Sequence, residues 1–463
     1  MPSTENRTDR RVMLGVIFAL AWPTMLEQLM QTAVQYIDTA MVGSLGTQAT
    51  AAVGATGTVS WLVLGVVSAT GVGFLSSIAQ AYGAGDYQHA RRIAAQAVSV
   101  TVLVGTVLTV LMTAISQLVP VWMQVDPAIR QQAGQYFLII YCPMLFRSAS
   151  IIFGTLLRAV GDTKTPMRVG IAVNLTNVIL NFLLIYPART VTVFGAALPL
   201  WGAGMGVIGA AAASAVSYVV GGSVMTAALW RHRQVSPRGL SLRPDPALLA
   251  PCFRVALPNM LQRFGTSLGY VVFAAMINAL GGTATAAHTV ANTVESAFYI
   301  PGWGMQAAAA TLAGNAFGAR DRQRLKSLGR AILPLEIGLM VLSGGLLFVF
   351  ARPLVCIFSA DPEVIQLGTT VLRMVAVSEP FYGVPIVVEG MMQGVGKTAA
   401  PLLFNLLGMW CVRIAGTWVC TVLLHMGLVA AWGCMIGHNL LLFVLFGRHY
   451  LTGRWNPMEQ RPD

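Results

Sequence analysis

Long apolar stretches recur along the whole chain, separated by short clusters of charged residues, glycine or proline. Each is about 20 residues long, which is the length an α-helix needs to cross a bilayer. They lack the ten-residue alternation of a membrane β-barrel, so helices are favoured. The pattern predicts twelve transmembrane helices, at residues 14–41, 50–80, 93–119, 131–157, 168–186, 205–230, 255–279, 286–313, 331–351, 366–392, 400–424 and 428–447.

The composition agrees with a membrane protein. Of the 463 residues, 56% are hydrophobic and only 10% are charged, whereas soluble domains carry about 25% charged residues. The net charge of +12 comes from short basic clusters between apolar runs, without the continuous basic stripe that nucleic-acid binding requires. We therefore expect membrane lipid rather than nucleic acid as a partner, and we expect a monomer.

The basic residues also predict the orientation of the chain. Of its 29 Lys and Arg residues, 22 lie at the two termini or in the even-numbered connections, and the opposite side has three, Arg130, Arg189 and Arg352. Positive charge accumulates on the cytoplasmic side of a membrane. Both termini are therefore predicted to be cytoplasmic, in a multi-pass protein of the cell inner membrane.

The sequence contains an internal repeat with a constant offset of 235 residues. Gln80–Asp86 matches Asn315–Asp321, and Pro23 falls on Pro258. Each half has an even number of predicted spans, so the two halves are oriented alike, as in some alternating-access transporters. We predict an N-lobe at 1–230, a cytoplasmic linker at 231–250 and a C-lobe at 251–463 with a short cytoplasmic tail, and expect a binding site between the lobes.

Several motifs strongly resemble those of the multidrug and toxic compound extrusion (MATE) family, in its bacterial NorM- and DinF-like branch. They are Pro23, the run Asp38–Gly46, Ala79–Asp86, Leu157–Pro166, Ala286–His288 and Gly314–Ala319. The likeness covers residues 14–447. It implies two pseudo-symmetric six-helix lobes in an outward-opening V. It also implies export of drugs and organic cations in exchange for H⁺ or Na⁺.

Charged residues inside the predicted spans are candidates for the mechanism, because burying a charge in hydrocarbon costs several kcal/mol. The acids are Glu27, Asp38, Glu295, Glu336, Glu379 and Glu389, and the bases are Arg147, Arg263, Arg373 and Arg413.

Asp38 is the strongest candidate, because a carboxylate in a low-dielectric cavity can take up a proton at a useful pH. Asn174, Asn177 and Asn181 lie on one face of the fifth span. The resemblance implies a cation site at Asp38, Asn177 and Asn181, with Ser214 where threonine is common. Archaeal-type members have Asp where Asn181 stands here, so we expect H⁺ rather than Na⁺, and no other metal. In the structural alternative, Asp38 only satisfies a helix end and the asparagines join helices.

Glu27 lies three helical turns before Asp38 on the same face of the first span. It is predicted either to attract cationic substrate or to pair with Arg147. Pro23 removes a backbone hydrogen bond, and is predicted to act as a hinge or as a static kink.

In the second half, the positions of the NorM-type acids fall on Thr266 and Tyr382, so that site is not carried over. Further substrate or cleft candidates follow from the remaining charges in the spans. They are Glu295, Glu379, Glu389 and Arg263. Arg263 or Arg373 could pair with one of these acids, and a purely structural buried ion pair is the alternative.

No nucleotide-binding loop or catalytic motif is present, so neither a cofactor nor enzyme activity is predicted. The leading interpretation is secondary active multidrug efflux. The alternatives are a lipid-linked oligosaccharide flippase of the same superfamily, and a membrane enzyme or receptor without transport.

Overall fold

The computed structural model describes residues 4–54, 57–193 and 196–459, and these fold into long helices with one small hairpin. The first half contains α1 (Thr4–Gly43), α2 (Thr47–Gly54), α3 (Gly57–Gly83), α4 (Tyr87–Ala114), α5 (Val119–Trp122), α6 (Pro127–Tyr141), α7 (Met144–Ala159), α8 (Lys164–Leu184), β1 (Pro187–Val193), β2 (Ala196–Ala203) and α9 (Gly206–Arg231). The second half contains α10 (Pro246–Asn278), α11 (Gly282–Phe298), α12 (Ile300–Gly318), α13 (Arg322–Phe358), α14 (Pro362–Gly394), α15 (Ala399–Leu407), the π-helix η1 (Gly408–Ile414), α16 (Ala415–Trp418), the π-helix η2 (Val419–Leu423) and α17 (Leu428–Leu451).

Each of the twelve predicted spans coincides with one helix or with a broken run of helices. Within the described residues, ten helices are long and apolar enough to cross a membrane, and the pair α6 and α7, bent by 48°, raises this number to eleven. The remaining predicted span is divided into α11 and α12. Here α11 is rich in Thr and contains Glu295, and Pro301 begins α12, so length and composition alone do not mark the pair as a span.

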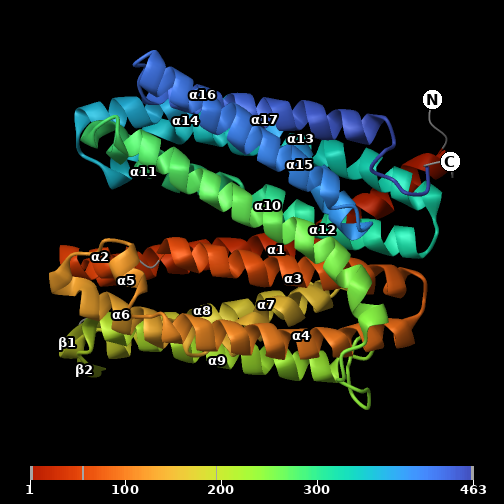
Figure 1. The fold of residues 1–463 in the computed structure, drawn as a ribbon, viewed down its shortest axis with the longest axis horizontal. Coiled ribbons are helices and arrows are strands. Elements are labelled where there is room, and N and C mark those ends of the chain that lie inside the picture. Colours follow the sequence, from red (N-terminus) through yellow and green to blue (C-terminus); the bar gives the residue numbers. More distant parts are fainter. Residues whose placement is uncertain (1–3, 55–56, 194–195, 460–463) are drawn as a thin grey trace.

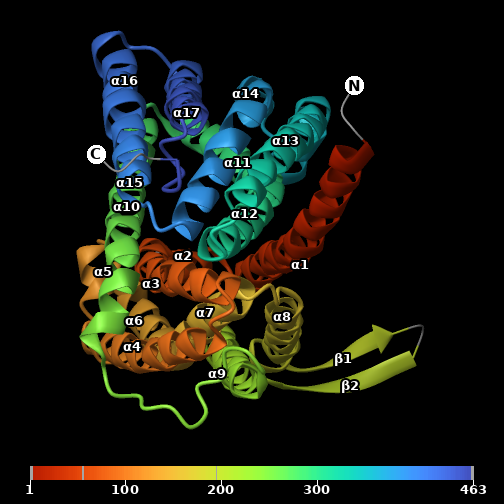
Figure 2. The same ribbon diagram turned by 90° about the vertical axis from the view of Figure 1, so that its right-hand side faces the viewer.

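The helices form two lobes (Figures 1 and 2). The predicted arrangement of two helical lobes is confirmed. Helices α10 to α17 lie on one side of Figure 2, and α2 to α9 on the other. The lobes meet where α3 packs against α10 and α12.

Helix α1 belongs to both lobes. In its first half, Ile17, Leu20 and Ala21 are buried in the core of the C-lobe, whereas near its end Met41 and Val42 pack with Ile185, Val207 and Ala210 of the N-lobe. Hydrophobic burial therefore holds the two ends of α1 in different lobes. Pro23 is buried between these two regions, inside an otherwise continuous helix.

The repeated motif forms a reciprocal contact between the lobes. A Cβ on Gly83 would overlap the backbone of Asn315, and a Cβ on Gly318 would overlap the backbone of Gln80. These four residues are related by the 235-residue offset, so the contact is the same seen from either lobe. Gln80 adds a hydrogen bond from its Nε2 to the carbonyl of Gly394, at 3.0 Å. Only glycine permits helices α3 and α12 to approach this closely.

The connection between the two halves, residues 232–245, is hydrogen-bonded to α4. Arg91 donates from Nε to the carbonyl oxygen of Ser236 at 2.8 Å, and Gln96 donates to the carbonyl of Arg243 at 2.9 Å. Helix α10 begins at Pro246, inside the predicted linker, because Asp245 caps its first turn by accepting from the amide of Ala247.

Figure 1 shows this connection at the same end of the molecule as the start of α1 and the end of α17. The antiparallel hairpin β1–β2 lies at the opposite end. The sequence did not predict this hairpin, because the segment was interpreted as a connection between spans.

Candidate functional site

Asp38 lies in a polar network inside the N-lobe. It is half-buried near the end of α1, and one carboxylate oxygen accepts a hydrogen bond from Nδ2 of Asn181 at 2.5 Å. Asn181 and Asn177, one helical turn apart on α8, are 1% and 6% exposed. Asn177 reaches the hydroxyl of Ser214 on α9 at 3.1 Å. The structure therefore brings together Asp38, Asn177, Asn181 and Ser214, whereas Asn174 lies outside this network among the described residues.

The Asn177 amide can face Asp38 in two ways. In one orientation its Oδ1 accepts from Asn181 and its Nδ2 donates to Ser214. After a 180° rotation, Nδ2 lies 2.9 Å and 3.2 Å from the two oxygens of Asp38, and Oδ1 accepts from Ser214. The rotated amide suits an ionised carboxylate, which only accepts, whereas the first orientation suits a protonated acid, which also donates. The hydrogen bonds around Asp38 therefore favour the rotated amide.

Glu27 forms an ion pair with Arg158 of α7, at 2.6 Å. The predicted pairing with Arg147 is wrong, because the guanidinium of Arg147 lies over the ring of Tyr218 at 4.4 Å. Glu27 and Arg158 are one-fifth exposed or less. The backbone of Arg158 also accepts a hydrogen bond from Thr311 of α12 at 3.0 Å, so this pair lies where α1 and α7 meet the C-lobe.

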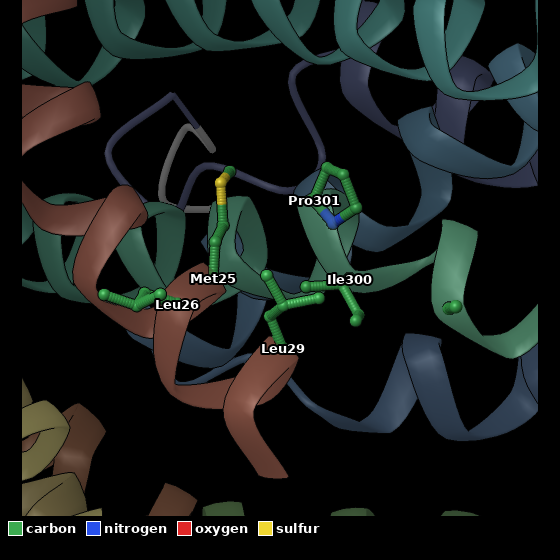
Figure 3. A pocket seen from close by; sticks show the side chains of 6 residues that line it. Met25, Leu26, Leu29, Ile300 and Pro301 are labelled. Carbon is green, nitrogen blue, oxygen red and sulfur yellow. The ribbon is translucent and has the colours of Figure 1, made fainter. Parts of the chain in front are cut away.

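An apolar hollow of about 370 Å³ lies between α1 and the C-lobe (Figure 3). Met25, Leu26 and Leu29 of α1 line one side, and Ile300 and Pro301 of α12 line the other, with Ala297. Its lining comes from α1 and from the neighbouring helices α11 and α12 of the C-lobe. It begins two residues after Pro23, so a bend at Pro23 would change its shape.

The C-lobe encloses a second, polar cavity of about 210 Å³. Three of the predicted candidates, Arg263, Glu295 and Glu389, line it. Glu379 does not line it, although it is buried at 1% exposure and neither of its oxygens finds a hydrogen-bond partner within the described part of the chain.

The predicted ion pairs of the C-lobe are not formed. Glu389 accepts instead from Gln262 and Asn405, at 2.9 Å and 3.1 Å, and Glu295 accepts from the hydroxyl of Tyr299. Arg373 lies away from these acids, over the ring of Phe348 at 5.5 Å. Neutral donors thus satisfy these carboxylates and leave the arginines without a carboxylate partner.

Two candidate functional residues, Arg158 and Arg413, were not predicted from the sequence. Arg158 was counted among the residues of a cytoplasmic connection, although it is the penultimate residue of α7 and its long side chain reaches Glu27. Arg413 was noted as an intramembrane base without a role, yet it lines the C-lobe cavity and is 4% exposed. Charged residues are rare inside membrane spans, so the presence of Arg413 in one could have marked it as a candidate.

A comparison with known protein families identifies the fold. The model of the MatE family matches residues 23–183 and again residues 258–419, one copy for each half of the chain. The chain belongs to the MatE family. This membership confirms the resemblance seen in the sequence, and the two matched segments correspond to the two halves of the internal repeat.

Among curated relatives of this MatE protein, a probable multidrug resistance protein NorM of Thermotoga maritima is 28% identical over 95% of this chain and 92% of its own length. A NorM of Brucella suis is 31% identical, over about half of each chain. Another relative is a probable multidrug resistance protein YoeA of Bacillus subtilis, 23% identical over 92% of this chain and 91% of its own length.

Solved structures share the fold over nearly the whole chain. An outward-facing multidrug resistance MATE transporter superimposes with a TM-score of 0.87 at 21% identity, covering 97% of both chains. A mutant of the Vibrio cholerae MATE transporter VcmN gives 0.87 at 18% identity, over 97% of this chain and 99% of its own. At this identity the likeness establishes the fold of this MatE protein, a multi-pass membrane protein.

Proposed function

We propose that this protein is a secondary active exporter of small organic molecules, often cationic, in the inner membrane, driven by exchange for H⁺ at Asp38. Membership of the MatE family and the multidrug resistance relatives support the activity. The observation that carries the coupling step is the network in which Asn181 and Asn177 approach the carboxylate of Asp38. Both termini are placed in the cytoplasm, on the basis of the positive charge at that end.

We propose that the coupling step depends on the amide of Asn177. When Asp38 is ionised, two amides donate to it, and α1 is held against α8 by a charge. When Asp38 takes up a proton, the amide of Asn177 can turn to accept it, and the attraction becomes that of neutral hydrogen bonds, roughly half as strong. Protonation therefore weakens the hold of the N-lobe on the end of α1.

Pro23 gives this change a route to the substrate site. The part of α1 before Pro23 is buried in the C-lobe, while the part after it carries Glu27 and Asp38 on the N-lobe side. Proline lacks the amide hydrogen of an ordinary helix bond, so bending there is less costly than elsewhere. A bend would move Met25 and Leu29, which line the hollow between the lobes. We therefore propose Pro23 as the hinge and this hollow as part of the substrate path.

Proton coupling is favoured over Na⁺ by the composition of the network. Na⁺ and other hard cations prefer several oxygen ligands, and here Asp38 is the network's single carboxylate. Within the described residues, no group of three or more His, Cys, Asp or Glu side chains is arranged to hold a metal ion. We expect transport without any cofactor.

The test is ethidium transport into inverted vesicles or proteoliposomes under an imposed ΔpH or ΔpNa. We expect ΔpH alone to drive uptake, and Asp38→Asn to abolish it, because an amide cannot exchange a proton. Glu336→Gln is the matched control, since Glu336 is also a buried acid within a span but lies in the C-lobe. Transport driven only by ΔpNa would refute proton coupling, and transport by neither gradient would refute antiport. Normal uptake by Asp38→Asn would show that the coupling site lies elsewhere.

A further inference from the structure

The C-lobe cavity contains an arginine whose hydrogen-bonding groups are not satisfied. Arg413 projects from η1 and is 4% exposed. Its Nε finds no hydrogen-bond partner, and no carboxylate oxygen lies within 4.0 Å of it, among the residues that the structure describes. An arginine cannot lose its charge in a protein. The cavity therefore always contains a positive charge.

Aromatic rings stabilise the charge of this guanidinium but do not accept hydrogen bonds from its N–H groups. Its Cζ lies 4.2 Å from the ring centre of Phe273 and 4.8 Å from that of Tyr270. These contacts stabilise the charge through the face of the guanidinium. The N–H groups point outward in its plane, where rings cannot accept from them, and each buried donor without an acceptor costs about 1–3 kcal/mol.

The two acids that line the cavity are engaged elsewhere. Glu389 accepts from three amides, of Gln262 at 2.9 Å, Gln393 at 3.0 Å and Asn405 at 3.1 Å, and Glu295 accepts from Tyr299. Neither approaches Arg413 to ion-pair distance. No side chain among the described residues therefore supplies the acceptor that Arg413 lacks, and a bound ligand can supply it.

The surroundings of Arg413 specify what that acceptor is. His438 and Asn439 of α17 also line the cavity and are 5% and 4% exposed, and neither ring nitrogen of His438 finds a partner in the described residues. Together with Arg413 they present N–H donors. Tyr382 and Trp303 add aromatic walls. A planar carboxylate matches the fork of a guanidinium with two parallel hydrogen bonds.

We propose that the C-lobe cavity is a binding site for a small organic carboxylate, with Arg413 as its anchor. The volume of about 210 Å³ is below the 300–1,000 Å³ of drug-sized pockets, so the ligand is a small acid, such as a single aromatic ring with a carboxylate. Arg413 lies in a π-helix, an element that occurs mostly as short insertions at functional sites.

This proposal goes beyond cation-coupled export and does not use the Asp38 network. The 235-residue offset of the repeat places Phe273 where the N-lobe has Asp38, and the guanidinium of Arg413 lies over that ring. The duplicated position thus has a carboxylate in one lobe, and an aromatic ring beneath a cation in the other.

The test is equilibrium dialysis of radiolabelled benzoate against the purified full-length protein in detergent. Benzamide and benzamidine, which have the same shape but are neutral and cationic, serve as competitors. We expect saturable benzoate binding, at least about tenfold weaker competition by benzamide, and no competition by benzamidine. The proposal is overturned if benzoate shows no saturable binding in the millimolar range, or if benzamidine competes as well as benzoate. This comparison uses the native protein and does not depend on any variant folding.

Variants then locate the site. Arg413→Gln should lower benzoate affinity at least about tenfold, as expected for losing hydrogen bonds to a charged group, and Arg413→Lys should have an intermediate effect, because it keeps the charge but loses the fork. Arg373→Gln is the matched control, an exposed intramembrane arginine outside the cavity, and should bind as the native protein does. Unchanged affinity in a monodisperse Arg413→Gln protein would overturn the assignment. Asp38→Asn should still bind benzoate, so a failure of export and a failure of this site give separate results.

Discussion

The two lobes share one fold and one repeat but differ in the side chain at one pair of equivalent positions. In the N-lobe, the carboxylate of Asp38 is surrounded by amide donors from α8. In the C-lobe, the equivalent position is Phe273, and the nearby charge is the cation of Arg413. A duplicated scaffold therefore fixes where helices pack, while single side chains decide which charge lies in each lobe. We propose that this difference separates a cation site in the N-lobe from an anion site in the C-lobe.

The buried acids also differ in how well they are satisfied. Asp38 accepts a hydrogen bond from Asn181, and the amide of Asn177 lies beside it. Glu336 and Glu379 are 0% and 1% exposed, and none of their four oxygens finds a partner within the described ranges. An ionised carboxylate in such a place would cost several kcal/mol. A buried acid in a span is therefore not sufficient to mark a coupling site.

The largest effect is expected at the reciprocal contact between α3 and α12, where the two halves of the chain are alike. Gly83→Leu and Gly318→Leu should each lower ethidium export at least about tenfold, because a side chain at either position overlaps the backbone of the other lobe. The two variants should lose the same share of their export activity if the contact is symmetric. Vesicle transport, with the amount of inserted protein measured, tests this.

Gly338→Leu is the control for the glycine variants, since a Cβ there meets nothing within 4 Å. It should transport normally. A strong loss from only one of Gly83→Leu and Gly318→Leu would show that the contact is not reciprocal. Normal export by both would show that the lobes need not approach at these glycines.

The next effect tests the unsatisfied acids of the C-lobe. Glu336→Met should stabilise the protein by about 1–3 kcal/mol, because it replaces two unpartnered buried oxygens with an apolar group of similar size. The midpoint of thermal unfolding in detergent measures this change. Glu363→Met, at an exposed acid of α14, should change stability by less than about 0.5 kcal/mol. A destabilised Glu336→Met protein would mean that Glu336 has a role in the fold that its contacts do not explain.

The ion pair of the N-lobe should give a smaller effect. Glu27→Gln and Arg158→Gln, combined in a double-mutant cycle, should show a coupling energy of about 1–2 kcal/mol, since both side chains are at most one-fifth exposed. Unfolding midpoints of the two single variants and the double variant provide the cycle. Arg147→Gln replaces Arg158→Gln in the control cycle, where no coupling with Glu27 is expected. Coupling to Arg147 instead would restore the pairing first inferred from the sequence.

The smallest effect compares two arginine–aromatic contacts in the C-lobe. The pair Phe273 and Arg413 is buried, with a separation of 4.2 Å, while Phe348 is 45% exposed and lies 5.5 Å from Arg373. Double-mutant cycles with Phe→Leu and Arg→Gln should give about 1 kcal/mol or more for the first pair and less than about 0.5 kcal/mol for the second. Equal couplings would mean that burial does not strengthen the contact at Phe273.

Much of the fold could be predicted from the sequence because the membrane imposes a strong pattern. Hydrophobic length located every predicted span, and the matched Pro, Gly and Asp residues of the repeat predicted two lobes. The division of α1 between the lobes could not be predicted, since its residues are apolar on both sides of Pro23 and only packing shows that Ile17 and Met41 lie in different cores.

The site was predictable where helical spacing sufficed. Asn177 and Asn181 share one face of α8, and the family resemblance joined them to Asp38 and Ser214. The partner of Glu27 was not predictable. Arg147 and Arg158 lie on the same helix, and the sequence does not show which of them faces α1. Only the packing of α1 on the N-lobe brings Arg158 to Glu27. The role of Arg413 depends on which acids are already hydrogen-bonded, and spacing along the chain carries no information on that.

The proposed coupling requires Asp38 to exchange a proton as the transported molecule binds. Proton release on adding saturating ethidium to purified protein, in weakly buffered detergent, measures this directly with a pH-indicator dye. Because coupling between two ligands is reciprocal, the native protein should release up to about one proton per chain at a pH where Asp38 is protonated, and Asp38→Asn should release none. Equal release from the native protein and from an Asp38→Asn protein that still binds ethidium would contradict the account.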